Sequence, residues 1–488
     1  MFRVRRPRTP ESVLQSVDRA LGELIARTVA AHHRRRLGRI GQLDALEAPA
    51  GGWAAGGPPP RPGNALEVLI DGAEAFPRII AELTSAEAHV HLTGWYVSPD
   101  FALTRGEKPL IFRNLLAELA ERVEVRVLLW AGAPLPLFRP SRRDVREVAR
   151  ELAESGIPCA VDSRERPLHC HHEKTIVVDG RVAFVGGIDI TSQDGDRFDT
   201  SDHPARAQVG WHDVTTCFSG PAVADVGAHF RFRWKEITGE ELPVPSIPAA
   251  AGGIELQVVR TVPEKVYDAC PRGDFRILES YVRALRGAER LIYLENQFLW
   301  SPEITEILRG KLRSPPTDDF RIVALLPAKP NSGNDDTRGA LAELVEADGD
   351  AGRFLACTLA ARSDRLIDPV YVHAKVGIVD DRWLTIGSAN LNEHSLFNDT
   401  EMNVVTHDPD LARHTRLRLW AEHLELNPAD VEGDPVDVIE RYWKPISEEQ
   451  FARRKAGEPL THRLVLLPHV SRSSGRLLGP LQGLLVDG

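Results

Sequence analysis

Short apolar runs bounded by polar and turn residues recur through most of the chain. They include residues 90–95 and 125–129 in the first half, and 291–300 and 321–326 in the second. Runs of this length are typical of buried strands. Stretches with a helical pattern, such as 113–122, separate them. This alternation predicts an α/β fold.

The N-terminal region has a different pattern. A Thr9-Pro10-Glu11 start signal precedes apolar residues at helical spacing from Leu14 to Val29, and arginines flank this stretch. We predict a basic amphipathic helix, followed by a Gly/Pro-rich linker over 48–64. The helix could lie on an anionic membrane or dock on the main body. We favour docking, because basic residues at a helix C-terminus also complement the helix dipole.

Landmarks of the first half return in the second half in the same order. Pro99 precedes His172-Glu173-Lys174 by 73 residues, and Pro302 precedes His373-Ala374-Lys375 by 71. An apolar run and an aspartate follow each His-x-Lys triplet at identical spacing. Two copies of one α/β unit explain this best.

The repeat predicts the domain organisation. We expect four parts: an N-terminal helix and linker (1–64), a first lobe (65–250), a second lobe (251–425) and a C-terminal extension (426–488).

The His-x-Lys triplets carry the candidate chemistry. If the triplet lies on a strand, His172 and Lys174 share one face, because side chains alternate with period two. Asp179 falls in an Asp-Gly pair, which predicts a hairpin turn between 174–178 and 182–185. Glycine beyond the hairpin, as in Gly186-Gly187-Ile188-Asp189, permits close approach of a ligand. The second copy reads Gly387-Ser388-Ala389-Asn390.

The pattern HxKxxxxD, followed after six residues by GGxD or GSxN and present twice, resembles the phospholipase D superfamily. The resemblance covers residues from about 69 to beyond 420. It implies two pseudo-symmetric α/β/α sandwich lobes that share one metal-free phosphodiesterase site at their interface. The first copy ends in Asp189 rather than asparagine, and an ionised carboxylate there would repel phosphate.

The resemblance also implies residue roles. His172 would attack phosphorus and form a covalent intermediate, and His373 would protonate the leaving group and then activate water or an alcohol. The remaining assignments are phosphate binding by Lys174, Lys375, Asn390, Ser388 and Gly187, and supporting roles for Asp179, Asp380 and Asp189.

Each histidine needs an acceptor for its far ring nitrogen. Asp213 and Glu401 each begin a strand-like run and each precede a proline by eight residues. We predict that they are the orienting carboxylates. Solvent-exposed acids at the strand starts are the alternative.

Composition narrows the substrate and the compartment. The net charge of -10 disfavours a nucleic-acid partner. Five cysteines without a CxxC spacing indicate reduced thiols rather than a disulfide framework. No apolar run is long enough to span a bilayer. We expect a cytoplasmic protein, with peripheral membrane contact as an open alternative.

Two further clusters resemble metal sites, but their patterns do not predict a bound metal. Residues 169–172 read His-Cys-His-His, and consecutive strand residues point to opposite faces. Asp194, Asp196 and Asp199 resemble part of a calcium loop that lacks its closing glutamate. We therefore predict no metal and no cofactor.

Three functions fit this reading. Trp211-His212 and Glu295-Asn296-Gln297-Phe298 resemble the eukaryotic-like branch of the superfamily, which favours a phospholipid substrate. The leading hypothesis is a phospholipase D with transphosphatidylation as a partner activity. A cardiolipin synthase-like phosphatidyltransferase is the second, and a nuclease of the same superfamily is the third.

Overall fold

The structure is a computed structural model that describes residues 13–134, 139–167, 169–329, 334–349, 351–362 and 369–467. The predicted start signal at Thr9 lies outside these residues.

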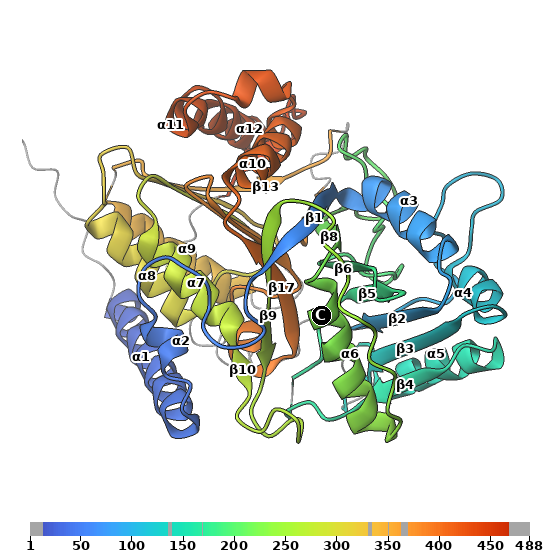
Figure 1. The fold of residues 1–488 in the computed structure, drawn as a ribbon. Coiled ribbons are helices and arrows are strands. Elements are labelled where there is room, and N and C mark those ends of the chain that lie inside the picture. The colour runs from blue at the N-terminus through green and yellow to red at the C-terminus, as the bar shows by residue number, and fades with distance from the viewer. Residues whose placement is uncertain are drawn as a thin grey trace, which may run out of the picture.

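Two lobes with the same strand order meet in the middle of the molecule (Figure 1). The sheet of the first lobe runs β4-β3-β2-β5-β6-β8-β1, and that of the second runs β13-β12-β11-β15-β16-β17-β9. The central strands β1 and β9 pair antiparallel and join the two sheets. This confirms the predicted pair of α/β lobes.

The first lobe contains strands β1 (Arg61–Ile70), β2 (His89–Gly94), β3 (Glu124–Trp130), β4 (Cys159–Asp162), β5 (Thr175–Val178), β6 (Val182–Gly186) and β8 (Val214–Ser219). Its helices are α3 (Asp71–Thr84), α4 (Phe112–Ala120), α5 (Arg142–Glu154) and α6 (Val223–Thr238).

The second lobe repeats this set with strands β9 (Ile254–Val262), β11 (Leu291–Glu295), β12 (Arg321–Leu325), β13 (Phe354–Leu359), β15 (Val376–Val379), β16 (Trp383–Gly387) and β17 (Glu401–Thr406). Its helices are α7 (Arg276–Gly287), α8 (Pro302–Arg313), α9 (Asn334–Asp348) and α10 (Pro409–Leu424).

The remaining elements are α1 (Val13–Ile40), α2 (Asp44–Glu47), β7 (Trp211–His212), β10 (Asp274–Phe275), β14 (Tyr371–Val372), η1 (His394–Asn398), η2 (Pro428–Val431), α11 (Pro435–Val438), η3 (Ile439–Trp443), α12 (Lys444–Ala456) and β18 (Leu464–Leu466).

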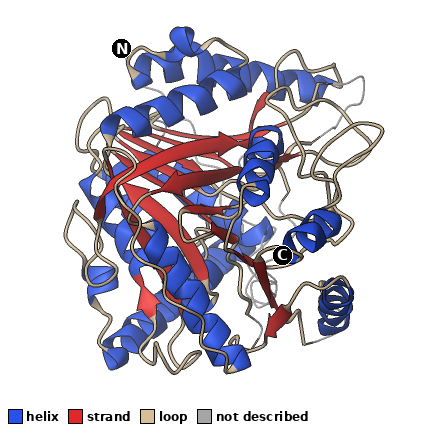
Figure 2. Ribbon diagram, turned by 45° about the vertical axis from the view of Figure 1, so that its right-hand side comes forward, coloured by secondary structure: helices blue, strands red, loops and turns tan. Residues whose placement is uncertain are grey.

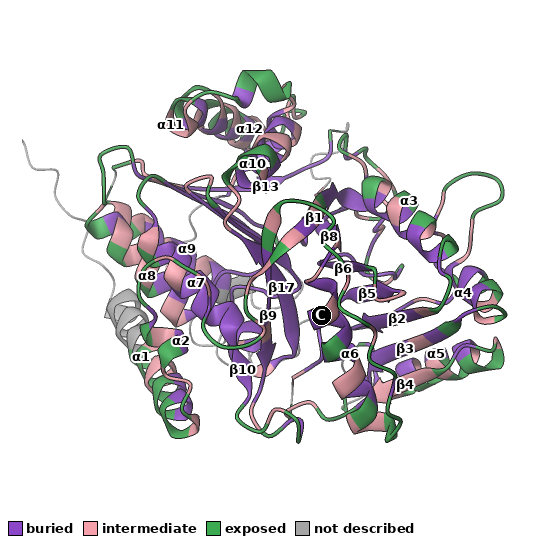
Figure 3. Cartoon of the chain, viewed as in Figure 1, coloured by how far each residue is buried: buried purple, intermediate pink, exposed green. Residues whose placement is uncertain are grey.

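Helices cover both faces of each sheet, and the strands between them are buried (Figures 2 and 3). In β3, Val127 packs with α3, α4 and α5 on one face, while the next residue, Leu128, packs against α6 on the other. Such runs are apolar on both faces because both faces are covered. One hydrophobic cluster contains strands of both lobes, so the lobes share a core.

The N-terminal region packs on the second lobe. Leu37 of α1 lies in the core cluster that includes α8, and Arg36 forms a buried ion pair with Glu264. The docking interpretation of the helix therefore holds for its C-terminal half. The predicted linker is too long, because β1 already begins at Arg61 and the Asn64 side chain is buried in hydrogen bonds to Arg61 and Ile254.

The C-terminal extension adds to the second lobe. Its strand β18 pairs antiparallel with β13 at the outer edge of the sheet. Among the described residues, no helix combines the length and the apolar composition needed to cross a membrane.

Candidate active site

Each His-x-Lys triplet is held by the backbone of the opposite lobe. The N–H of His172 donates to the carbonyl of Thr400 at 2.9 Å, and the N–H of His373 donates to the carbonyl of His212 at 2.8 Å. The triplets lie immediately before β5 and β15. The prediction that they lie on the strands is therefore wrong, because each strand begins three residues after its histidine. The crossed contacts bring the two imidazole rings to 6.4 Å between centroids.

The carboxylates at the strand starts also cross between the lobes. Nδ1 of His172 lies 3.1 Å from Oε1 of Glu401, and Nδ1 of His373 lies 2.6 Å from Oδ2 of Asp213. All four side chains are buried. Each histidine of one lobe thus meets a carboxylate of the other through its Nδ1.

Serine hydroxyls hold Glu401 in place. Ser388 and Ser395 both donate to its carboxylate, at a very short distance for Ser388 and at 2.5 Å for Ser395. Ser388 therefore positions Glu401, and its contact with phosphate stays a prediction. Ser395 was missed by the sequence analysis, because it lies in a π-helical turn outside the repeated motif.

Glycine makes room for Asp213. A Cβ on Gly187 would lie 2.1 Å from Oδ1 of Asp213, so no side chain fits there. The N–H of Gly187 donates to the carbonyl of Val214 at 2.9 Å. This N–H is consequently engaged within the sheet, and the phosphate contact of Gly187 stays a prediction.

The two lysines are anchored differently. Lys174 lies 3.3 Å from Asp189, so the departure of the first motif from asparagine gives a buried ion pair. Lys375 donates at 3.3 Å to Oε1 of Gln297, which also accepts from Nδ2 of Asn390 at 3.3 Å. Gln297 lies in the Glu-Asn-Gln segment singled out in the sequence, but its link to the second motif was not predicted.

Burial and the neighbouring lysine charges shift the pKa values of the ionisable groups in the site. The pKa of Lys375 is lowered to about 7, mainly by burial and also by the charge of Lys174, against the opposing effect of Asp213. The pKa of His373 falls well below its ordinary value, first through burial and then through Lys375 and Lys174. Burial raises the pKa of Asp213 to about 6.

The pKa of Glu401 is shifted in the same direction as that of Asp213. Burial, reinforced by the charge of Asp399, raises its pKa well above the ordinary value, while the hydrogen bonds from the two serines oppose the shift.

The motif aspartates lie outside the catalytic cluster. Asp179 accepts hydrogen bonds from the backbone N–H groups of residues 87, 88 and 89, and Asp380 accepts from those of 289, 290 and 291. Both residues have positive φ, 55° and 53°, at the predicted hairpin turn. They fix this turn against the start of the neighbouring strand β2 or β11.

The clusters set aside in the sequence have separate partners. Nδ1 of His169 meets His394 at 3.0 Å, whereas His171 lies 3.1 Å from Asp162. Asp196 forms an ion pair with Arg206 at 2.8 Å. The consecutive residues 169–172 therefore do not converge on one point.

The family model described as cardiolipin synthase, PLD-like domain, matches residues 317–421, which contain the second triplet. Phospholipase D A of Dictyostelium discoideum is 24% identical and aligns with 78% of this chain and 37% of its own length. The chain belongs to the phospholipase D superfamily.

Other relatives within this superfamily carry two kinds of name. Phospholipase D alpha 4 of Arabidopsis thaliana is 25% identical over 73% of this chain and 64% of its own length. The major cardiolipin synthase ClsA of Bacillus subtilis is 23% identical over 72% of this chain and 67% of its own length. The chain spans between 30% and 64% of the length of the similar phospholipase D proteins.

Phosphatidylserine synthase of Haemophilus influenzae aligns with 80% of this chain and 94% of its own, with 13% identity and a TM-score of 0.49.

Proposed function

We propose that this chain cleaves the headgroup phosphodiester of phospholipids through a covalent phosphohistidine on His172. The observation that carries the proposal is the crossed pair of histidine–carboxylate contacts, His172 with Glu401 and His373 with Asp213, beside two buried lysines. A phosphodiesterase needs a nucleophile, an acid for the leaving alkoxide, and positive charge around the phosphoryl oxygens. The site contains residue types for all three.

The first step forms the intermediate. Nε2 of His172 attacks phosphorus, and the bond from phosphorus to the headgroup oxygen breaks. Protonated His373 donates its Nε2 proton to this oxygen, so the headgroup leaves as a neutral alcohol. The carboxylate of Asp213 accepts from Nδ1 of His373 and stabilises the imidazolium.

The second step reverses these roles. Neutral His373 removes a proton from water, the water oxygen attacks phosphorus, and the bond to His172 breaks to release phosphatidate. An alcohol in place of water gives a new phosphatidyl ester and accounts for transphosphatidylation. The same residues therefore support hydrolysis and transfer.

Lysine charge takes the place of a metal in this chemistry. Lys174, Lys375 and the amide of Asn390 bind the phosphoryl oxygens. A bound phosphodiester anion offsets the cations that lower the pKa of His373, so substrate binding favours its protonated form. No cofactor takes part in either step.

Phosphatidyl transfer to a second lipid alcohol is the alternative function, favoured by the cardiolipin synthase description of the matching family model. Mixed phospholipid vesicles supplied with a primary alcohol test the two together, with products identified by mass. Phosphatidate and a phosphatidyl alcohol support the main proposal. Cardiolipin from phosphatidylglycerol alone supports the alternative.

If none of the lipids loses its headgroup and single-stranded DNA is cleaved, hydrolysis and phosphatidyl transfer are both contradicted and a nuclease is favoured.

A phospholipid substrate implies that the protein contacts the membrane surface peripherally. The acidic net charge of -10 implies that contact with an anionic bilayer rests on local basic or apolar groups.

A further inference from the structure

A second group of ionisable side chains lies directly behind the Asp213–His373 pair. Its members are Asp71 at the start of α3, His203 in the loop before β7, His212 in β7, and Glu422 in α10. One ligand atom from each side chain lies within 4.8 Å of the others. Asp71, His203 and His212 are at most 1% exposed, and the Glu422 side chain is 7% exposed.

The distances between these atoms fit a four-coordinate ion. Nδ1 of His212 lies 3.0 Å from Oδ1 of Asp71 and 3.3 Å from Oε1 of Glu422. Nε2 of His203 lies 3.1 Å from the same Glu422 oxygen and 3.8 Å from Oδ2 of Asp71. A tetrahedral zinc ion with bonds of about 2.0–2.1 Å places its ligands about 3.3–3.4 Å apart. The observed separations, which involve both carboxylate oxygens of Asp71, lie on either side of that value.

The far nitrogens of both histidines are already oriented. Nδ1 of His203 lies 3.1 Å from Asp199, and Nε2 of His212 lies 2.9 Å from Glu295. A metal-binding histidine typically donates its other N–H to a carboxylate, which fixes the tautomer and ring orientation. Oδ2 of Asp71 is buried, has no hydrogen-bond partner among the described residues, and lies 3.8 Å from Nε2 of His203. This oxygen is the independent sign of a missing ligand.

The ligand atoms indicate which ion fits. Both histidines face carboxylates with both ring nitrogens, and the two ring centroids lie 5.5 Å apart in a buried site. A divalent cation at the centre bonds all four ligands at once. Nitrogen and oxygen ligands in equal number suit zinc better than calcium or magnesium, which prefer oxygen.

We propose that these four side chains bind one zinc ion, which supports the active site from behind and takes no part in the reaction. Three ligands belong to the first lobe and Glu422 belongs to the second, so the ion ties the lobes together. It also fixes Asp213, because the N–H of Asp213 donates to Oδ1 of Asp71 at 3.1 Å. The N–H of Asp71 donates to the Asp213 carbonyl at 2.8 Å.

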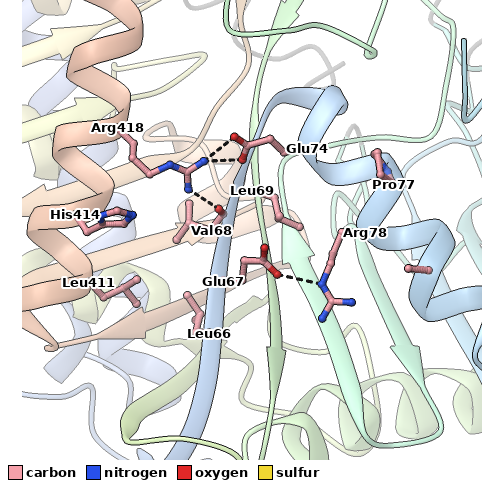
Figure 4. A pocket seen from close by; sticks show the side chains of 11 residues that line it. Leu66, Glu67, Val68, Leu69, Glu74, Pro77, Arg78, Leu411, His414 and Arg418 are labelled. Carbon is pink, nitrogen blue, oxygen red and sulfur yellow. Dashed lines mark hydrogen bonds and ion pairs between the residues drawn. The ribbon is translucent and has the colours of Figure 1, made fainter. Parts of the chain in front are cut away.

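The helices that carry Asp71 and Glu422, α3 and α10, are also joined to each other at the protein surface. Arg418, one turn before Glu422 in α10, forms hydrogen bonds of 2.7 and 2.6 Å with the Glu74 carboxylate of α3 (Figure 4). This pair lines a groove of about 730 Å³ whose walls include Glu67 and His414. The groove contains none of the four proposed ligands. Because its four ligands are buried, the ion would be shielded from solvent and slow to exchange.

Metal content of the purified, untagged protein tests the proposal without any assay of activity. We expect one zinc per chain by elemental analysis, and less than a fifth of that in Asp71→Asn and in His203→Gln. His229→Gln is the matched control. His229 is equally buried and bonds Glu173 at 2.6 Å, but it lies outside the group, so this variant should keep its zinc.

Cobalt substitution keeps the test decisive if the ligand variants fail to fold. Wild-type protein unfolded in chelator and refolded with cobalt(II) should show the strong visible absorption of a four-coordinate ion, with two histidine nitrogens and no sulfur by X-ray absorption. Folded protein that takes up neither zinc nor cobalt would overturn the proposal. Zinc retained in both ligand variants, or cobalt bound through sulfur, would overturn it as well.

Discussion

Replacing Asp213 with asparagine removes the negative charge beside His373 and leaves an oxygen that can still accept from Nδ1. The 2.6 Å contact is buried, and a pKa of about 6 means that the carboxylate is ionised at pH 7.5. Hydrogen bonds to charged groups contribute about 1.5–3 kcal/mol. Since about 1.4 kcal/mol is tenfold in rate, protonation of the leaving group should slow by about 10- to 150-fold.

The assay compares two phosphatidyl esters that differ in the leaving group. With an alkyl headgroup, which needs a proton to leave, kcat for Asp213→Asn should fall by the full factor. With a nitrophenyl ester, the rate of the nitrophenolate burst should change much less, because this leaving group departs as an anion and needs no proton.

The control is Asp434→Asn, a surface aspartate that pairs with Arg290 at 2.7 Å. It should keep the parent rates on both esters. An Asp213→Asn enzyme that turns over the alkyl ester at the parent rate, with an unchanged melting temperature, would refute the assigned role of the carboxylate.

Three further outcomes are expected. Gly187→Ala should lower kcat at least tenfold by displacing Asp213, whereas Gly310→Ala, where a Cβ meets no atom within 4 Å, should not; steady-state kinetics of both variants check this. Asp179→Asn should lower the free energy of unfolding by about 1–2 kcal/mol, measured in urea, because three backbone N–H groups lose a charged acceptor. The value of kcat/KM should fall below about pH 6, as Asp213 gains a proton, and above about pH 7, as Lys375 loses one. A flat profile from pH 5 to 9 would contradict this last assignment.

Repetition within the sequence made the fold predictable. Matched strands and matched triplets imply two similar lobes, and the Asp-Gly pair at 179–180 implies the hairpin that the structure contains. Each of these inferences rests on local periodicity or turn chemistry, which a single chain segment determines.

Contacts between the lobes were not predictable in the same way. The bonds from His172 to Glu401 and from His373 to Asp213 join residues 229 and 160 positions apart. Their partner choice depends on how the lobes meet, which no local pattern encodes. For the same reason, the sequence did not reveal the contacts of Gln297 or the buried group around His212. The bond from Ser388 to Glu401 was not predicted either, because a motif position reveals a residue type but not which neighbour its hydroxyl bonds.

The covalent intermediate is the most direct test of the account. In His373→Asn, a nitrophenyl phosphodiester should still react with His172, and the adduct should accumulate because the base that activates water is missing. After a quench that preserves phosphohistidine, peptide mapping should place the modification on the segment that carries His172. An adduct on the His373 peptide in the converse variant, His172→Asn, would exchange the two roles, and the absence of an adduct from both variants would contradict covalent catalysis.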